Sequence, residues 1–433
     1  LGKEHPGTAS TYSIIAPIYQ AQGDMDKALE YYQKAVKFLD KEDPDIAYTY
    51  NNIASLYHFQ GDYPKALHYY QKALHKKKRI LGKNDPSTAA TYKNLGSYYH
   101  NQDDHPKALK YCKKALRIYT NVLGQEHPDT AATYHEIAKL YLAEGEYTKA
   151  LEYFQKSLFI REKMLGNEHP DTVRTYNRIA MVYYHQGDFS KASEYYQKVL
   201  DFKEKLFGKE DPKTAVTYNN LAECFINQGD YSKALQYLKK CLDISIKENG
   251  NEHFRTAEIY FNLAEVHRVQ GEKIKAIDSF QKSIGAWKNR FGKTIKIAEP
   301  HRKLGALYKA EDNYPMALQH YQKALDIYEK VYGEEHLKNA EAYCNLAEIY
   351  LFQKDYTNAL PCLQNALKIY KKSLGEEHPN TAIVYHSLAV TYKNQGDYPN
   401  ALKYFNKMLK ITTKVLGGQD PATAVNYANM AEV

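Results

Sequence analysis

Cysteine is scarce in this chain of 433 residues, which has five: Cys112, Cys224, Cys241, Cys344 and Cys362. Their number is odd, and no two of them form a CxxC pair. This pattern argues against a disulfide framework and against a zinc site, and it favours a reducing compartment. We therefore expect a cytoplasmic protein.

Long apolar runs and catalytic motifs are also missing. No apolar run approaches the roughly 20 residues that cross a bilayer, and the chain does not start with the basic and apolar regions of a signal peptide. The sequence contains no Gly-rich phosphate loop, no HExxH and no GxSxG. We expect a protein without enzymatic activity, metal or cofactor, and without a membrane partner.

The charge balance is modest, because 59 Lys and Arg stand against 51 Asp and Glu, a net charge of +8. Spread over the whole chain, this excess permits acidic partners but does not demand nucleic acid. Tyrosines interleaved with lysines are compatible with RNA binding, but we assign the tyrosines to the core. We therefore expect no nucleic-acid partner.

Internal repetition is what the chain has in abundance. A glycine recurs every 42 residues from Gly82 to Gly292, and it returns at Gly333, Gly375 and Gly417. His or Asp before Pro forms a second recurring marker, as in His127-Pro128. The spacing predicts one array over residues 1–433. Its repeats start near residues 5, 43, 85, 127, 169, 211, 253, 295, 336 and 378, and a truncated eleventh starts at 420.

Each repeat contains two helical patterns. In the repeat from residue 85, Tyr92, Leu95 and Tyr99 lie at i, i+3 and i+7 and share one face of a first helix. Ala108 and Cys112 mark the face of a second helix. Glycine followed by Asp or Glu lies between the two patterns in most repeats, which suits a tight turn, and the Asp can cap the second helix. The His or Asp before Pro is expected to cap the first helix, with Pro at its first position.

One such hairpin cannot bury both of its apolar faces, so the next hairpin must cover the open one. Small residues recur in the first helices, as at Ala54, Gly96 and Gly305, and we expect them to let the first helices approach closely. Tyrosine recurs at the large positions, which accounts for the 42 tyrosines of the chain. These residues predict an all-α solenoid of about ten hairpins.

The pattern of a large residue, x-x-Leu/Ile-Ala/Gly-x-x-Tyr, then Ala, an aromatic residue and Ala, resembles the tetratricopeptide repeat (TPR) signature. The 42-residue period resembles the kinesin light chain subtype, as in HPDTAATYHEIAKLYLAEGEYTKALEYFQKSLFIREKMLG from His127 to Gly166. The resemblance implies a right-handed superhelix whose first helices line a concave groove that grips peptide segments. The coiled coil through which kinesin light chains bind heavy chains is absent, and ten repeats exceed the usual array of that family.

In the TPR signature, the two residues after the large aromatic one face the groove, as do positions one turn further on. The predicted groove residues are Asn51, Asn52, His58, Lys93, Asn94, His135, Lys139, Arg174, Asn177, Arg178, Tyr184, Asn219, Asn220, Asn262 and Asn345. The recurring asparagines have two interpretations. Their amides can bond to the main chain of a bound peptide, or they can bond to the neighbouring helix.

The predicted groove is basic in repeats three to five, with Lys93, Lys139, Arg174 and Arg178 against Glu136. Basic side chains with aromatic neighbours suit an acidic peptide that carries a large side chain. The alternative is that these cations pair with acidic residues of adjacent helices. The run Lys76-Lys77-Lys78-Arg79 lies late in a second helix, where we expect a solvated outer face.

Two functions from different classes follow. The first is a cytosolic scaffold that captures acidic or extended peptide segments of protein partners in its groove. The alternative is the sensor or autoinhibitory arm of a larger signalling, defence or enzymatic protein. Open ends of the array, with Tyr427 and Met430 in the last helix, predict fraying or self-association there.

Overall fold

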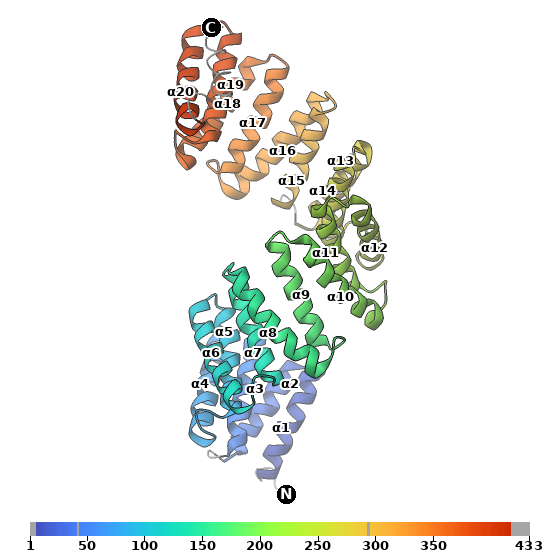
Figure 1. Ribbon diagram of the computed structural model, residues 1–433, viewed down its shortest axis with the longest axis vertical. Coiled ribbons are helices and arrows are strands. Elements are labelled where there is room, and N and C mark those ends of the chain that lie inside the picture. Colours follow the sequence, from blue (N-terminus) through green and yellow to red (C-terminus); the bar gives the residue numbers. More distant parts are fainter. Residues whose placement is uncertain (1–5, 41–42, 292–294, 417–433) are drawn as a thin grey trace. The chain divides into compact units, whose positions relative to one another are not determined.

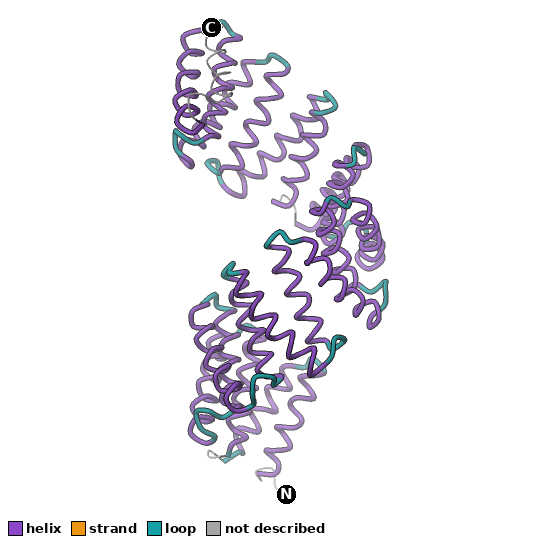
Figure 2. Tube along the Cα trace, in the orientation of Figure 1, coloured by secondary structure: helices purple, strands orange, loops and turns teal. Residues whose placement is uncertain are grey.

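The computed structural model describes residues 6–40, 43–291 and 295–416, and their regular structure is helical (Figures 1 and 2). No strand occurs in these three ranges. The predicted all-α class and its repeated hairpins are therefore confirmed. The predicted start of the first repeat at His5, the truncated eleventh repeat and its Tyr427 and Met430 lie outside the described residues.

Contacts within the chain group residues 1–208 and residues 209–433 into two compact units, which we call unit 1 and unit 2. In both units, each odd-numbered first helix packs against the even-numbered second helix that follows it. Within a unit, each second helix also packs against the next first helix. That the two units form a single array stays a prediction of the repeat spacing.

The helices of unit 1 are 14 to 19 residues long. Its first helices are α1 (Pro6–Ala21), α3 (Pro44–Gln60), α5 (Pro86–His100), α7 (Pro128–Ala143) and α9 (Pro170–His185). Its second helices are α2 (Met25–Phe38), α4 (Tyr63–Ile80), α6 (His105–Val122), α8 (Tyr147–Leu165) and α10 (Phe189–Phe207).

Unit 2 repeats the same pattern (Figure 1). Its first helices are α11 (Pro212–Gln228), α13 (Phe254–Val269), α15 (Ile295–Lys309), α17 (Leu337–Phe352) and α19 (Pro379–Asn394). Its second helices are α12 (Tyr231–Asn249), α14 (Lys273–Phe291), α16 (Tyr314–Tyr332), α18 (Tyr356–Leu374) and α20 (Tyr398–Leu416).

The helix starts have the predicted caps. Oδ1 of Asp85 accepts a hydrogen bond from the backbone N–H of Ser87 at 2.7 Å, and Nδ1 of His127 accepts one from Asp129 at 3.1 Å. Histidine and aspartate can share this position because both side chains accept from a free backbone N–H of the first turn. Gly61 makes the turn between α3 and α4 at a φ of 81°, a conformation that glycine adopts without strain.

Tyrosines fill the interior of the hairpins, as predicted. The ring of Tyr111 in α6 lies 6.0 Å from that of Tyr92 and 5.4 Å from that of Tyr99, both in α5. The same pairing of first and second helix recurs at Tyr218 and Tyr237 in unit 2, with ring centroids 5.9 Å apart.

The small position of the first helix faces the second helix of its own hairpin in two cases. A Cβ on Gly96 would lie 2.3 Å from Sγ of Cys112, and one on Gly305 would lie 2.8 Å from the ring of Tyr321. The expectation that these glycines let first helices approach one another is therefore corrected. They let the two helices within one hairpin approach, because the partner side chain occupies the space of a Cβ.

Candidate functional site

The predicted groove residues lie on the odd-numbered helices, and we call the surface that they form in each unit its first-helix face. In unit 1, the face consists of Asn51, Asn52 and His58 of α3, Lys93 and Asn94 of α5, His135 and Lys139 of α7, and Arg174, Asn177, Arg178 and Tyr184 of α9. In unit 2, it includes Asn219 and Asn220 of α11, Asn262 of α13 and Asn345 of α17. These residues are half-buried except for Arg174, which is exposed, and His135, which is buried.

Several of the recurring asparagines bond to a neighbouring helix. Nδ2 of Asn94 donates to Oδ1 of Asn51 at 3.2 Å, and Nδ2 of Asn262 donates to Oδ1 of Asn219 at 3.3 Å. Nδ2 of Asn52 donates to the hydroxyl of Tyr32 at 3.3 Å. An amide group has two N–H donors and an acceptor oxygen with two lone pairs, so one bond leaves it further bonding capacity. The asparagines therefore connect successive helices.

The four cations of unit 1 differ in their partners. Nζ of Lys139 lies 2.9 Å from Oε2 of Glu136, and Nη1 of Arg174 lies 2.8 Å from Oδ1 of Asp171. Both partners lie three residues earlier on the same helix.

The other two predicted groove cations, Lys93 and Arg178, differ in whether a carboxylate lies near them. Nζ of Lys93 lies 3.7 Å from Oδ1 of Asp129, at the start of the next first helix. Arg178 has no carboxylate within 4.0 Å among the described residues, and its Nη1 contacts Sδ of Met181 at 3.6 Å. Three of the four predicted groove cations therefore have a carboxylate nearby, and one does not.

The ring of His135 is not accessible at the surface, since only 3% of the residue is exposed. Its Nδ1 lies 3.3 Å from Nη1 of Arg161, which also donates to the carbonyl of Asp171 at 2.8 Å and to the hydroxyl of Thr175 at 2.7 Å. Burial and the nearby guanidinium of Arg161 lower the pKa of His135 to about 2, so the ring is neutral. The prediction that His135 lines the groove is corrected, because the ring lies between α7, α8 and α9.

Lys77 corrects a second expectation, that the basic run 76–79 forms a solvated outer face. The residue is 2% exposed, and its Nζ donates to the backbone carbonyl of Ser87 at 3.0 Å. The same Nζ lies 4.7 Å from the ring centroid of Tyr48. Burial lowers the pKa of Lys77 to about 8, although the charge of Asp85 acts against that shift. Lys77 thus joins its own hairpin to the next one.

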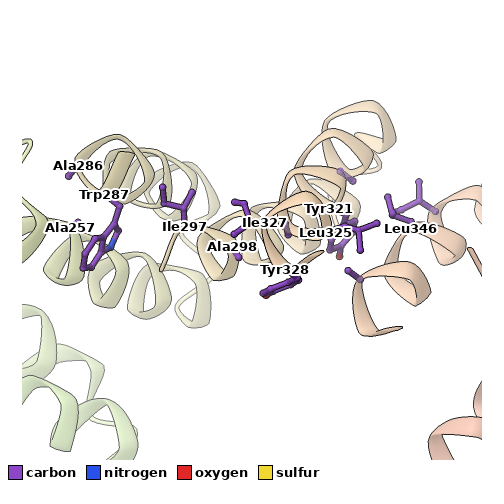
Figure 3. Close-up of a cluster of buried hydrophobic side chains, with 14 residues drawn as sticks. Ala257, Ala286, Trp287, Ile297, Ala298, Tyr321, Leu325, Ile327, Tyr328 and Leu346 are labelled. Carbon is purple, nitrogen blue, oxygen red and sulfur yellow. The ribbon is translucent and has the colours of Figure 1, made fainter. Parts of the chain in front are cut away.

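Lys77 occupies a position of the second helix that recurs along the chain, and we call it the inter-hairpin position. In unit 1, it is occupied by Lys77, Tyr119, Arg161 and Lys203, and in unit 2 by Ser245, Trp287, Tyr328, Tyr370 and Thr412. All of these residues are buried except Lys203 and Thr412, which are half-buried. In Figure 3, Trp287 lies in a core cluster with Ala257 of α13 and Ile297 of α15. A 42-residue alignment of the second helices identifies this position from the sequence.

The first-helix face of unit 2 is crossed by ion pairs between successive first helices. Nζ of Lys303 in α15 lies 2.9 Å from Oε2 of Glu265 in α13, where Arg268 also pairs at 3.1 Å. Further pairs join Lys296 to Glu258 at 3.3 Å, Arg302 to Glu341 at 3.7 Å and Lys309 to Glu348 at 2.7 Å. Most charges on this part of the face are thus paired with an opposite charge of another helix.

Glu223 of α11 is a half-buried carboxylate on the same face. Its Oε1 accepts from Nδ2 of Asn219 at 2.8 Å and from Nδ2 of Asn262 at 3.5 Å. Burial raises the pKa of Glu223, and the two amide bonds oppose that effect.

No helix in the described residues is long and apolar enough to cross a membrane. The same residues hold no group of three or more His, Cys, Asp and Glu side chains in a metal-binding arrangement.

A family model described as tetratricopeptide repeat matches residues 45–121, 92–163, 129–205, 171–247, 213–289, 296–356, 339–407 and 384–433. A second model with the same description matches residues 9–38. No curated protein matches the chain.

Three solved structures similar to the chain illustrate the range of matches. RapI in its apo form is 19% identical, with a TM-score of 0.47, and the match covers 66% of this chain and 98% of RapI. BtubC (BKLC) from P. vanneervenii is 21% identical, with a TM-score of 0.45, and the match covers 53% of this chain and 91% of BtubC. A kinesin light chain of nearly identical TPR-like repeats from Podosopora anserina is 23% identical, with a TM-score of 0.44, over 48% of this chain and 98% of that one.

Proposed function

Because the chain belongs to the tetratricopeptide repeat family, we propose that it is a protein-interaction scaffold that holds extended peptide segments on its first-helix faces. On the face of unit 1, the segment is acidic. The observation that carries the proposal is the row of half-buried amides and exposed or half-buried cations on α3, α5, α7 and α9.

The amides suit the main chain of an extended segment. Asn51 and Asn94 are already held by a mutual bond, so their side chains lose little further freedom when a ligand binds. An amide offers donors and acceptors to a peptide backbone and does not select a side chain. The row therefore supports binding of a main chain, while selectivity has to come from the charges.

The cations suit carboxylates of the ligand. Lys139 and Arg174 pair with residues three positions earlier on their own helices, and pairs of this kind stabilise a helix by only about 0.2–0.5 kcal/mol. A ligand carboxylate can replace such a partner at little cost. Arg178 has no such partner to lose, and its guanidinium can hold a carboxylate through two parallel bonds.

The test is a double charge reversal, Lys139→Glu with Arg178→Glu, and a labelled Glu-rich peptide is its ligand. A reversal of Lys110 and Lys113 to Glu on α6 is the matched control, since both lysines are exposed and the change in net charge is the same. We expect weaker binding and a shallower salt dependence in the first variant, and wild-type behaviour in the control at an unchanged melting temperature. Equal binding by wild type and both variants would refute the acidic assignment.

A further inference from the structure

Unit 2 contains a cavity of about 220 Å³ between α11, α12 and α13. Ala215, Val216, Ile244 and Ile259 supply its apolar wall, and Glu248 and Arg255 lie at its rim. Val216 is 59% exposed, so the apolar wall continues onto the first-helix face. Cavities of about 150 Å³ lined by aliphatic and aromatic side chains hold a benzene ring. The volume therefore admits one aromatic side chain.

The cavity exists because Ser245 occupies the inter-hairpin position. In the other hairpins from α3 to α18, Lys, Tyr, Arg or Trp occupies this position, and Thr412 of α20 is a second small residue there. The polar groups around Ser245 are already satisfied. Its Oγ lies 2.8 Å from Oγ1 of Thr256, and Sγ of Cys241 donates to the carbonyl of Ala215 at 3.3 Å. These groups beside Ser245 therefore do not need a buried water as a bonding partner.

The next hairpin shows what fills the equivalent space. There, the indole of Trp287 is buried, and Nζ of Lys296 lies 5.6 Å from its ring centroid. Lys296 also pairs with Glu258 at 3.3 Å. Arg255 is the equivalent of Lys296 in the preceding repeat, so it lies beside the Ser245 cavity as Lys296 lies beside Trp287. A cation over an aromatic face is attracted by the charge distribution of the ring.

We propose that the Ser245 cavity binds an aromatic side chain of a partner peptide, with the guanidinium of Arg255 over the ring. The inference rests on the proposed function only in taking the partner to be an extended segment. The partner ring would fill the space that Trp287 and Tyr328 fill from within the chain in the following hairpins.

The charge of Glu248 at the rim indicates which residue should stand next to the aromatic residue in the partner peptide. Glu248 is exposed and has no cation within 4.0 Å among the described residues. Glu258, which also lines the cavity, already pairs with Lys296. Glu248 therefore favours Lys or Arg beside the aromatic residue. This segment differs in chemistry from the acidic one proposed for unit 1.

The experiment uses the full chain and three labelled Gly-Ser peptides that contain Trp-Lys, Trp-Glu or Ala-Lys. Ser245→Tyr closes the cavity with the side chain found at positions 119, 328 and 370, and Ser245→Ala leaves the cavity open as the matched control. We expect the wild type and Ser245→Ala to bind the Trp-Lys peptide about tenfold more tightly than the Ala-Lys peptide. We expect Ser245→Tyr to lose that difference at an undiminished melting temperature. The Trp-Glu peptide should bind more weakly than Trp-Lys.

A folded Ser245→Tyr variant that binds the Trp-Lys peptide like the wild type would overturn the inference. A second measurement does not depend on any variant. Indole added to the wild-type chain with labelled isoleucine methyl groups should shift the signals of Ile244 and Ile259. Unshifted signals, or shifted signals without any preference for the Trp peptides, would also overturn it.

The outcomes separate this inference from the proposed function. The Ser245→Tyr variant should bind the Glu-rich peptide as the wild type does, since Lys139 and Arg178 lie in unit 1. If charge reversal in unit 1 has no effect while Ser245→Tyr abolishes the Trp-Lys preference, the acidic assignment fails and the aromatic site stands. If charge reversal weakens binding of the Glu-rich peptide while Ser245→Tyr keeps the Trp-Lys preference, the acidic assignment stands and the aromatic site fails.

Discussion

The first-helix face of unit 1 is joined mainly by neutral hydrogen bonds, whereas that of unit 2 is joined by ion pairs. Asn51 bonds Asn94 across α3 and α5, while Lys303 pairs with Glu265 across α13 and α15. The cations Lys139 and Arg174 of unit 1 pair only within their own helices among the described ion pairs. The charged residues of a first-helix face can thus pair mainly within one helix, as Lys139 and Arg174 do, or between successive helices, as Lys303 does.

The largest expected effect concerns the inter-hairpin position, which is filled by Trp287 and left small at Ser245. Trp287→Ala should lower the free energy of unfolding by about 3–5 kcal/mol, because the indole is buried between hairpins of unit 2. Ser245→Ala removes one hydroxyl contact and should cost about 1 kcal/mol. Denaturant unfolding of both variants measures the difference. A cost below that of Ser245→Ala would show that Trp287 does not join the hairpins.

The next effect concerns acid stability in unit 2. Nδ1 of His301 lies 2.9 Å from Nδ1 of His320, both rings are buried, and burial lowers both pKa values. The unfolded state binds these protons below the ordinary pKa of about 6.5, whereas the folded state does not. Stability is therefore fully present above that pH and is lost as the pH falls below it, by up to about 1.4 kcal/mol per pH unit for each histidine.

The double variant His301→Tyr with His320→Tyr tests this account, because tyrosines occupy both places at Tyr50 and Tyr69 of unit 1, with rings 5.9 Å apart. We expect the variant to lose less stability than the wild type between pH 6.5 and 5. Urea unfolding at several pH values measures this loss. Parallel curves for the two proteins would contradict the assignment to this pair.

Unit 1 should show a pH dependence of the same sign on the alkaline side. The pKa of Lys77 is lowered from 10.5 to about 8 by burial, so between these values the unfolded state binds the proton and the folded state does not. Stability should rise with pH in this window, by up to about 1.4 kcal/mol per unit. Lys77→Met lacks the titrating group, so its stability relative to wild type should decline steadily from pH 8 to 9.5. A stability difference between Lys77→Met and wild type that stays constant from pH 8 to 9.5 would contradict a lowered pKa of Lys77.

The smallest expected effect sharpens the comparison of the two faces. Removing the partly exposed pair with Lys303→Met and Glu265→Gln should change the free energy of unfolding by about 0.2–1 kcal/mol. The change should shrink in high salt, because screening weakens such pairs. Asn94→Ala in unit 1 removes a neutral bond instead, and its cost should not depend on salt. If the costs of Asn94→Ala and of removing the Lys303–Glu265 pair depended equally on salt, the two faces would not differ in how their helices are joined.

Repetition made the fold predictable, while single side chains limited the prediction of the site. The 42-residue markers predict the helices and their caps, since Asp85 and His127 act on backbone groups within their own turn. Lys77 and His135 were predicted wrongly because their surroundings come from the next hairpin. Ser87 supplies the carbonyl that Lys77 binds, and Thr175 and Asp171 hold the guanidinium that covers His135. The periodicity predicts which residues share a face of a helix. It does not predict which side chains of the next hairpin cover that face.

The most direct test of the central claim locates a bound acidic peptide on the chain. A Glu-rich peptide with a photoreactive group is cross-linked to the full chain in low salt, and the labelled residues are identified by mass spectrometry. We expect labels on α5, α7 and α9 around Lys139 and Arg178, and we expect them to disappear in high salt. Labels on α13, α15 and α17, or labels spread equally over both first-helix faces, would contradict it.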